Sequence, residues 1–138
     1  SNKAFYITTT LPYVNAEPHM GHALEFIRAD IIARWKKSQG NEVFFNTGTD
    51  EHGQKLFDAA TKAGKSVQAY VDEYAGHFRN LLPKLGMSKD VHFIRTTDPH
   101  HEKAAQEFWM RVAKNGFIYK KNYKCNQNVN VPSWYTVY

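Results

Sequence analysis

The chain has 138 residues, of which 42% are hydrophobic and 14% aromatic, and its formal net charge is +5. This length fits one domain or part of one, and the apolar content excludes a disordered chain. No apolar run approaches the roughly 18 residues that a membrane-spanning helix needs, so we expect no membrane partner. The single cysteine, Cys125, permits no internal disulfide and no Cys-based zinc site within this chain.

The first third of the chain predicts a strand, a helix and a second strand. Residues 5–10 are β-branched or aromatic without clean alternation, which favours a strand covered on both faces. A helix is expected from about Gly21 to Ser38, and a second strand over Glu42–Thr47. Leu24, Ile27, Ile31 and Trp35 form the expected buried stripe of that helix. The order indicates a parallel βαβ unit with a right-handed crossover.

Two polar loops follow these strands, Leu11–Pro18 and Gly48–Gly53. Parallel strands end at the same edge of their sheet, so we expect the two loops to face one crevice. The first loop leads into His19 and His22, which flank Gly21 at the start of the helix. A helix start offers backbone N–H groups and a positive dipole end to an anion.

The rest of the chain predicts further helices and short strands. Ser66 is a good N-cap for a long helix, which Pro83 and Gly86 should end. A later helix should begin at Asp98–Pro99. It is expected to bury Ala105, Phe108, Trp109 and Val112. The remaining expected elements are a helix over 54–63 and strands over 91–95 and 117–119. Residues 120–138 show no periodicity.

The His-x-Gly-His spacing suits phosphate chemistry. An imidazole at a helix start can donate hydrogen bonds to phosphate oxygens as charge builds up in a transition state. Gly21 has no Cβ and lets a nucleotide approach the backbone. An alternative hypothesis is a metal ion bound by His19, His22 and His52. The sequence shows no residues that would orient these histidines as metal ligands through hydrogen bonds. We therefore expect no metal site.

Four segments resemble the methionyl-tRNA synthetases, a family of class I aminoacyl-tRNA synthetases. Leu11-Pro-Tyr-Val-Asn-Ala-Glu-Pro-His-Met-Gly-His22 is similar to the signature called HIGH. Phe45-Asn-Thr-Gly-Thr-Asp-Glu-His-Gly-Gln-Lys55 is more specific for this family. Phe93–Thr97 and Asn115–Tyr119 add to the match. The resemblance implies an α/β fold, the first half of a Rossmann-like catalytic domain over 3–119. It leaves 120–138 as an irregular tail, the start or remnant of an inserted domain.

The resemblance also implies an activity and its residues. Such an enzyme activates methionine with ATP and Mg²⁺ and passes it to tRNA in the cytoplasm. The implied catalytic residues are His19 and His22, and the implied ATP-binding residues are Tyr13, His19, Gly21 and His22. The implied methionine-binding residues are Leu11, Tyr13, Asp50 and His52. Asp50 would pair with the substrate's ammonium group, and a carboxylate suits that role because an unpaired buried charge is costly.

Some family features are not found in this sequence. The second family signature, KMSKS, should lie far downstream, and we interpret the Met87-Ser-Lys89 match as chance. The regions that bind most of the tRNA are also absent. We therefore expect the chain alone to be inactive and to self-associate through its uncovered apolar surface. Two alternatives stay open: a non-catalytic tRNA- or partner-binding module, which the positive charge favours, and a non-synthetase HxGH nucleotidyltransferase.

Overall fold

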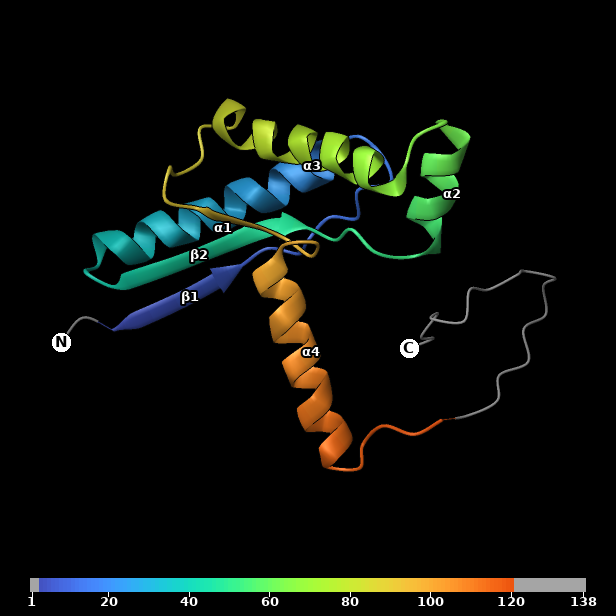
Figure 1. Ribbon diagram of the computed structural model, residues 1–138. Coiled ribbons are helices and arrows are strands. Elements are labelled where there is room, and N and C mark those ends of the chain that lie inside the picture. The colour runs from blue at the N-terminus through green and yellow to red at the C-terminus, as the bar shows by residue number, and fades with distance from the viewer. Residues whose placement is uncertain (1–2, 121–138) are drawn as a thin grey trace. The chain divides into compact units, whose positions relative to one another are not determined.

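The computed structural model describes residues 3–120, and its centre is a parallel three-stranded sheet (Figure 1). The strands are β1 (Ala4–Thr8), β2 (Glu42–Thr49) and β3 (His92–Arg95), in the order β1-β2-β3. Thr8 is paired with Asn46, and Asn46 with His92, so β2 is the middle strand. The expected parallel α/β architecture is confirmed.

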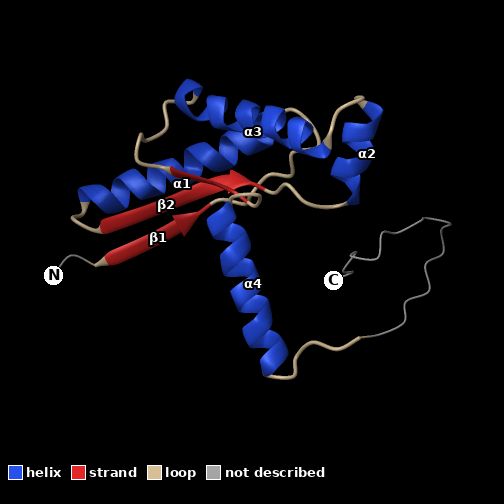
Figure 2. Cartoon of the chain, viewed as in Figure 1, coloured by secondary structure: helices blue, strands red, loops and turns tan. Residues whose placement is uncertain are grey.

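Four helices lie within residues 3–120 (Figure 2). They are α1 (Met20–Ser38), α2 (Gln54–Lys62), α3 (Val67–Lys84) and α4 (Pro99–Lys114). Ser66 caps α3 as expected, because its Oγ accepts from the N–H of Ala69 at 3.2 Å. The predicted helices are therefore confirmed, with α3 running one residue past Pro83.

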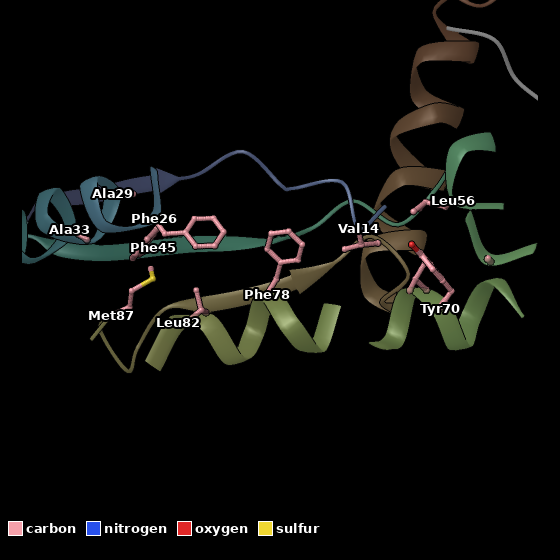
Figure 3. Packing of buried hydrophobic residues seen from close by; sticks show 12 residues of the cluster. Val14, Phe26, Ala29, Ala33, Phe45, Leu56, Tyr70, Phe78, Leu82 and Met87 are labelled. Atoms are coloured by element: carbon pink, nitrogen blue, oxygen red, sulfur yellow. The ribbon is translucent and has the colours of Figure 1, made fainter. Parts of the chain in front are cut away.

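The core lies between the sheet and two helices on one of its faces, α1 and α3 (Figures 1 and 3). Phe26 of α1 and Phe78 of α3 are completely buried, and Phe45 of β2 is only 4% exposed. Leu82 and Met87 complete this end of the cluster. Burial of side chains this large stabilises the fold by roughly 1.5–3 kcal/mol each. The rigid layer positions the loops at the carboxyl ends of the strands.

The predicted buried stripe of α1 is wrong. Its four residues are 37–60% exposed, whereas the helix buries small residues around Phe26. The exposed set is Leu24, Ile27, Ile31 and Trp35, and the buried set is Ala23, Phe26, Ala29, Asp30 and Ala33. Apolar residues occur on more than one side of α1, so periodicity alone could not choose the side that faces the sheet. Alanines permit close approach to the strands.

The expectation of a sheet covered on both faces is also wrong for the described residues. Tyr6 is 62% exposed and Phe44 is 47% exposed. Their rings stack at 5.7 Å, and Phe44 stacks on His92 at 4.2 Å. An aromatic row therefore lies open on the face opposite α1 and α3. The strand composition predicted a two-sided sheet, but within residues 3–120 this face of the strands is exposed.

Two expectations for the end of the described chain are wrong: the buried side of α4 and the strand over 117–119. No residue of α4 is buried, and Phe108 is 70% exposed. The chain divides into compact units after Ala105, within this helix. An apolar stripe shows that a helix has a packing face, but it does not supply the partner. Residues 117–119 form no strand.

The expected tail over 120–138 lies, apart from Lys120, outside the described residues, as does Cys125. None of the helices within residues 3–120 has the length and apolarity to cross a membrane.

Candidate functional site

The two loops after β1 and β2 meet, as the parallel arrangement predicts. Tyr13 and Asp50 form an isolated parallel bridge beyond the ends of the strands. The Asp50 N–H donates to the carbonyl of Pro12 at 2.9 Å, and the Val14 N–H donates to the carbonyl of Asp50 at 3.3 Å. These bonds hold the Asp50 backbone against the first loop, with Asp50 half-buried and Val14 fully buried beside it.

Tyr13 also reaches the next turn of the second loop. Its hydroxyl donates a 2.5 Å hydrogen bond to the carbonyl oxygen of His52. Gly53 follows with φ of 116°, a conformation that L side chains rarely adopt. A Cβ at this position would lie 2.3 Å from the Tyr13 hydroxyl oxygen. The glycine therefore permits both the turn and the close approach of the tyrosine.

The histidine pair forms the N-terminal cap of α1. Nδ1 of His19 accepts from the N–H of Gly21 at 3.1 Å, and Nδ1 of His22 accepts from the N–H of His19 at 3.2 Å. The two rings stack with centroids 3.8 Å apart. A neutral ring that accepts at Nδ1 carries its proton on Nε2, so both imidazoles keep an Nε2–H donor. The imidazole of His19 thus takes the Gly21 N–H that we expected to be offered to an anion.

The environment of His22 keeps it neutral. Burial, and then the electrostatic interaction with the His19 imidazole, lower the pKa of His22 below its ordinary value, while Glu25 acts in the opposite direction. The edge of its ring also packs on Phe78 of α3, with centroids 5.1 Å apart. Near neutral pH, His22 is therefore a hydrogen-bond donor through Nε2 and an acceptor through Nδ1.

The structure arranges the predicted residues in two groups. Tyr13, Asp50 and His52 are joined by the contacts between the loops. His19, Gly21 and His22 form the second group, which follows the first loop after Val14–Pro18. Leu11 is half-buried, and the resemblance alone connects it with a pocket. Within residues 3–120, no cluster of three or more His, Cys, Asp or Glu side chains is placed to hold a metal ion.

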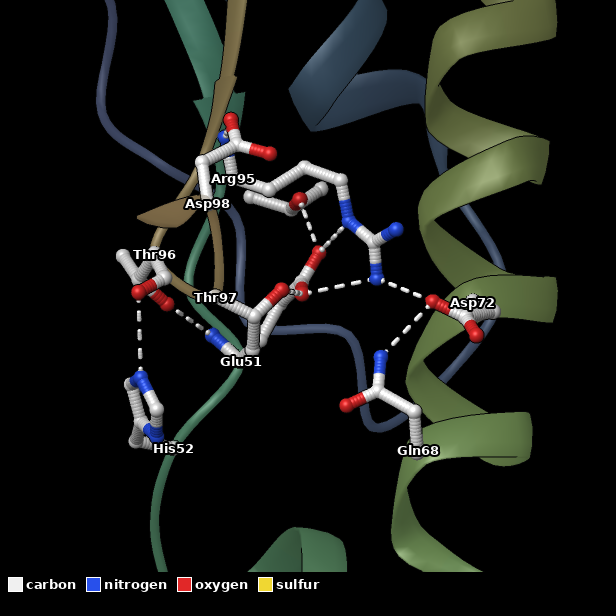
Figure 4. A network of polar contacts seen from close by, with 9 residues as sticks. Glu51, His52, Gln68, Asp72, Arg95, Thr96, Thr97 and Asp98 are labelled. Carbon is white, nitrogen blue, oxygen red and sulfur yellow. Dashed lines mark hydrogen bonds and ion pairs between the residues drawn. The ribbon is translucent and has the colours of Figure 1, made fainter. Parts of the chain in front are cut away.

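Sequence reasoning missed a polar network directly behind Asp50 and His52 (Figure 4). Glu51 is 2% exposed and pairs with Arg95, which comes from the end of β3. Thr96 and Thr97 extend the network. The sequence contained an indication of this network. The run Arg95-Thr96-Thr97 follows the third strand and so leaves the sheet at the same edge as the second loop, where it could pair with an acid of that loop.

The Met87-Ser-Lys89 match has a structural explanation. Met87 is 8% exposed and belongs to the core. The N–H of Ser88 donates to Oδ1 of the buried Asp30 at 2.9 Å. These contacts anchor the turn between α3 and β3 to α1.

The chain matches a family model described as tRNA synthetases class I (M) over residues 5–136. It is 50% identical to the methionine–tRNA ligase of Thermotoga maritima over 133 residues, which are 96% of this chain and 20% of that protein. It is 44% identical to the Rhizobium meliloti enzyme, covering 96% of this chain and 24% of that protein. The chain thus spans about a fifth to a quarter of these relatives.

A solved structure supports the same relationship. The Mycobacterium tuberculosis methionyl-tRNA synthetase in complex with methionyl-adenylate superposes with a TM-score of 0.80 at 44% identity. The match covers 83% of this chain and 22% of that one. The chain therefore belongs to the class I tRNA synthetases, in the group that contains the methionine–tRNA ligases.

Proposed function

We propose that the protein to which this chain belongs is a methionine–tRNA ligase. The observation that carries the proposal is the bridge between Tyr13 and Asp50. Tyr13 and Asp50 lie at one sheet edge, Tyr13 on the loop that leads into α1 and Asp50 on the loop after β2. A substrate amino acid needs a carboxylate partner for its ammonium group, and an aromatic ring is a suitable contact for the thioether of methionine.

The first loop is suited to methionine through Tyr13, and the second through Asp50 and His52. A half-buried carboxylate provides a partner for the substrate's ammonium group. The ring of Tyr13 provides a surface for the thioether, a contact that contributes roughly 0.3–1.5 kcal/mol. Leu11 is proposed as a further wall of this pocket.

The start of α1 is suited to ATP. The Nε2–H groups of His19 and His22 are donors without a net charge, and they can bind phosphate oxygens more strongly as negative charge grows in the transition state. Their Nδ1 atoms are fixed by backbone N–H groups, so the rings are oriented before the nucleotide arrives. Gly21 lets the His19 ring lie close, because a Cβ there would be 2.9 Å from Cε1 of His19. Gly21 and Tyr13 are proposed to contact the nucleotide as well.

The proposed first step needs no protein nucleophile. A carboxylate oxygen of methionine attacks the α-phosphorus of ATP, the bond from that phosphorus to the β-phosphate's bridging oxygen breaks, and pyrophosphate leaves. Mg²⁺ would neutralise phosphate charge and would enter with ATP. The methionyl group then passes from the adenylate to tRNA, bound mostly through regions outside this chain, in the cytoplasm.

Methionine-dependent exchange of pyrophosphate into ATP by the complete protein tests the proposal. Asp50→Asn should raise the KM for methionine about tenfold or more, since a hydrogen bond to a charged group contributes roughly 1.5–3 kcal/mol. His22→Ala should chiefly lower kcat, by about a hundredfold, as for loss of one transition-state donor. Asp90→Asn is the matched control, because it removes only a surface ion pair with Lys37.

The outcomes separate the proposal from its alternatives. Exchange that requires a different acid would identify another nucleotidyltransferase. Salt-sensitive tRNA binding by a complete protein that binds neither ATP nor methionine would indicate a binding module. If Asp50→Asn and His22→Ala both left methionine-dependent exchange unchanged, the roles given to these residues would be wrong. The 138-residue chain alone is expected to show no exchange.

A further inference from the structure

Glu51 lies between two proposed methionine-binding residues but points into the protein. Its side chain is completely buried, whereas Asp50 is half-buried and His52 is exposed. Glu51 is therefore the inward residue of this segment, and the residues on either side of it are more exposed.

Four hydrogen bonds satisfy the buried carboxylate (Figure 4). Oε1 accepts from the Thr49 hydroxyl at 2.7 Å and from Nε of Arg95 at 2.7 Å. Oε2 accepts from Nη2 of Arg95 at 2.9 Å and from the Thr97 hydroxyl at 2.5 Å. A buried charge is tolerated only with such partners, and loss of one partner leaves the other uncompensated. The two-point contact also fixes the plane of the carboxylate relative to the guanidinium.

Arg95 connects the loop to α3. Its Nη2 also donates to Oδ1 of Asp72 at 2.6 Å, and this contact lowers the pKa of Asp72. Glu51 and Asp72 together raise the pKa of Arg95. The guanidinium is thus neutralised by two carboxylates of the protein and does not compete with a substrate ammonium group for Asp50.

Thr96 connects the backbone of Glu51 to the side chain of His52. The N–H of Glu51 donates to the Thr96 hydroxyl at 2.8 Å, and Nε2 of His52 lies 3.2 Å from the carbonyl oxygen of Thr96. A carbonyl only accepts, so Nε2 carries the proton and Nδ1 of neutral His52 is an acceptor. The loop after β3 therefore determines both the place and the tautomer of this imidazole.

We propose that Glu51 and Arg95 are a positioning pair that holds Asp50 and His52 in the geometry that binds methionine. The inference rests on the proposed function and deepens it. Neither member touches the substrate. The pair locks the second loop to the loop after β3, so its loss moves the proposed binding residues while leaving the histidine pair at the start of α1 in place.

The test compares Glu51→Gln with wild type in the complete protein. Gln keeps the volume of the side chain but removes its charge. The KM for methionine in pyrophosphate exchange should rise about 10- to 100-fold, as for a misplacement of order 1 Å, while the KM for ATP changes by less than about twofold. Arg95→Lys should act in the same direction, because lysine cannot make the two-point contact. Glu73→Gln is the matched control, since it removes a charge from an exposed ion pair with Lys65.

A second measurement does not depend on activity. The ¹⁵N shifts of the imidazole nitrogens, assigned through His52→Gln, should report the Nε2–H tautomer of His52 in wild type and in Glu73→Gln, and a mixture of tautomers in Glu51→Gln. If Glu51→Gln does not fold, Thr97→Val removes a single donor to Glu51 and should produce the same changes at smaller amplitude.

The outcomes distinguish this inference from the proposed function. An unchanged His52 tautomer in Glu51→Gln, or an equal rise in both KM values, would overturn the positioning role. If the complete protein does not use methionine, the proposed function fails, and the tautomer measurement still decides whether Glu51 and Arg95 position His52.

Discussion

The hydroxyl of Tyr13 donates a 2.5 Å hydrogen bond to the carbonyl oxygen of His52. The bond joins the loop after β1 to the loop after β2. Tyr13→Phe removes it and leaves the ring in place, so the free energy of unfolding should fall by about 0.5–1.5 kcal/mol. Urea denaturation measures this change. Tyr6→Phe is the control, because Tyr6 is 62% exposed on the open face of the sheet and its loss of a hydroxyl should have no measurable effect.

The Tyr13 hydroxyl also leaves no space for a side chain at Gly53. Gly53→Ala places a Cβ 2.3 Å from it at φ of 116°, and strain of this kind costs about 1–3 kcal/mol. In a Tyr13→Phe background the close atom is gone and the ring carbon is 3.5 Å away, so part of the cost should disappear. A double-mutant cycle by urea denaturation measures the coupling. Strictly additive effects would mean that backbone conformation alone accounts for the glycine.

The sequence predicted that the loops carrying Tyr13 and Asp50 would face one crevice, because parallel strands end at one sheet edge. It did not reveal which acid of the second loop faces inward. Asp50 and Glu51 are adjacent acids, and the sequence gives no reason to bury one rather than the other. In the structure β2 ends just before them, and Glu51 is the one that is buried and paired with Arg95. For α1, apolar residues on several sides left the packing face undetermined until the sheet was placed.

Substitution of Gly48 and of Gly76 by alanine should change the stability of the protein in opposite directions. A Cβ on Gly48 would lie 1.8 Å from the carbonyl oxygen of Ile94, which is backbone and cannot move away. Gly48→Ala should therefore separate β2 from β3 and unfold the protein or lower its stability by more than about 3 kcal/mol, beyond the ordinary range for single substitutions. Gly76 lies in α3 with open space around it, so Gly76→Ala should stabilise the protein by about 0.5–1 kcal/mol. Thermal unfolding distinguishes the two, and a stable Gly48→Ala protein would contradict the strand packing.

The exposed apolar residues of α1 predict self-association of the isolated 138-residue chain. Leu24 is 52% exposed and Ile31 is 60% exposed on the same helix. Sedimentation velocity should show a weight-average mass that rises with protein concentration. Replacing Leu24 and Ile31 by Glu should reduce this dependence without loss of helical signal. A monomer at every concentration in the unsubstituted chain would show that this surface does not drive association.

His22 predicts a specific pH dependence of stability. Burial and the electrostatic interaction with the His19 imidazole lower the pKa of His22 in the folded state. The unfolded chain, with a histidine pKa of about 6.5, therefore binds its proton first as the pH falls. The stabilisation by neutral His22 is present above about pH 6.5 and is lost as the pH falls from there through the folded-state pKa. His22→Gln keeps a side-chain acceptor for the N–H of His19 but does not titrate. Urea denaturation across this range should show a smaller loss in His22→Gln than in wild type, and equal losses would mean that other groups account for the pH dependence.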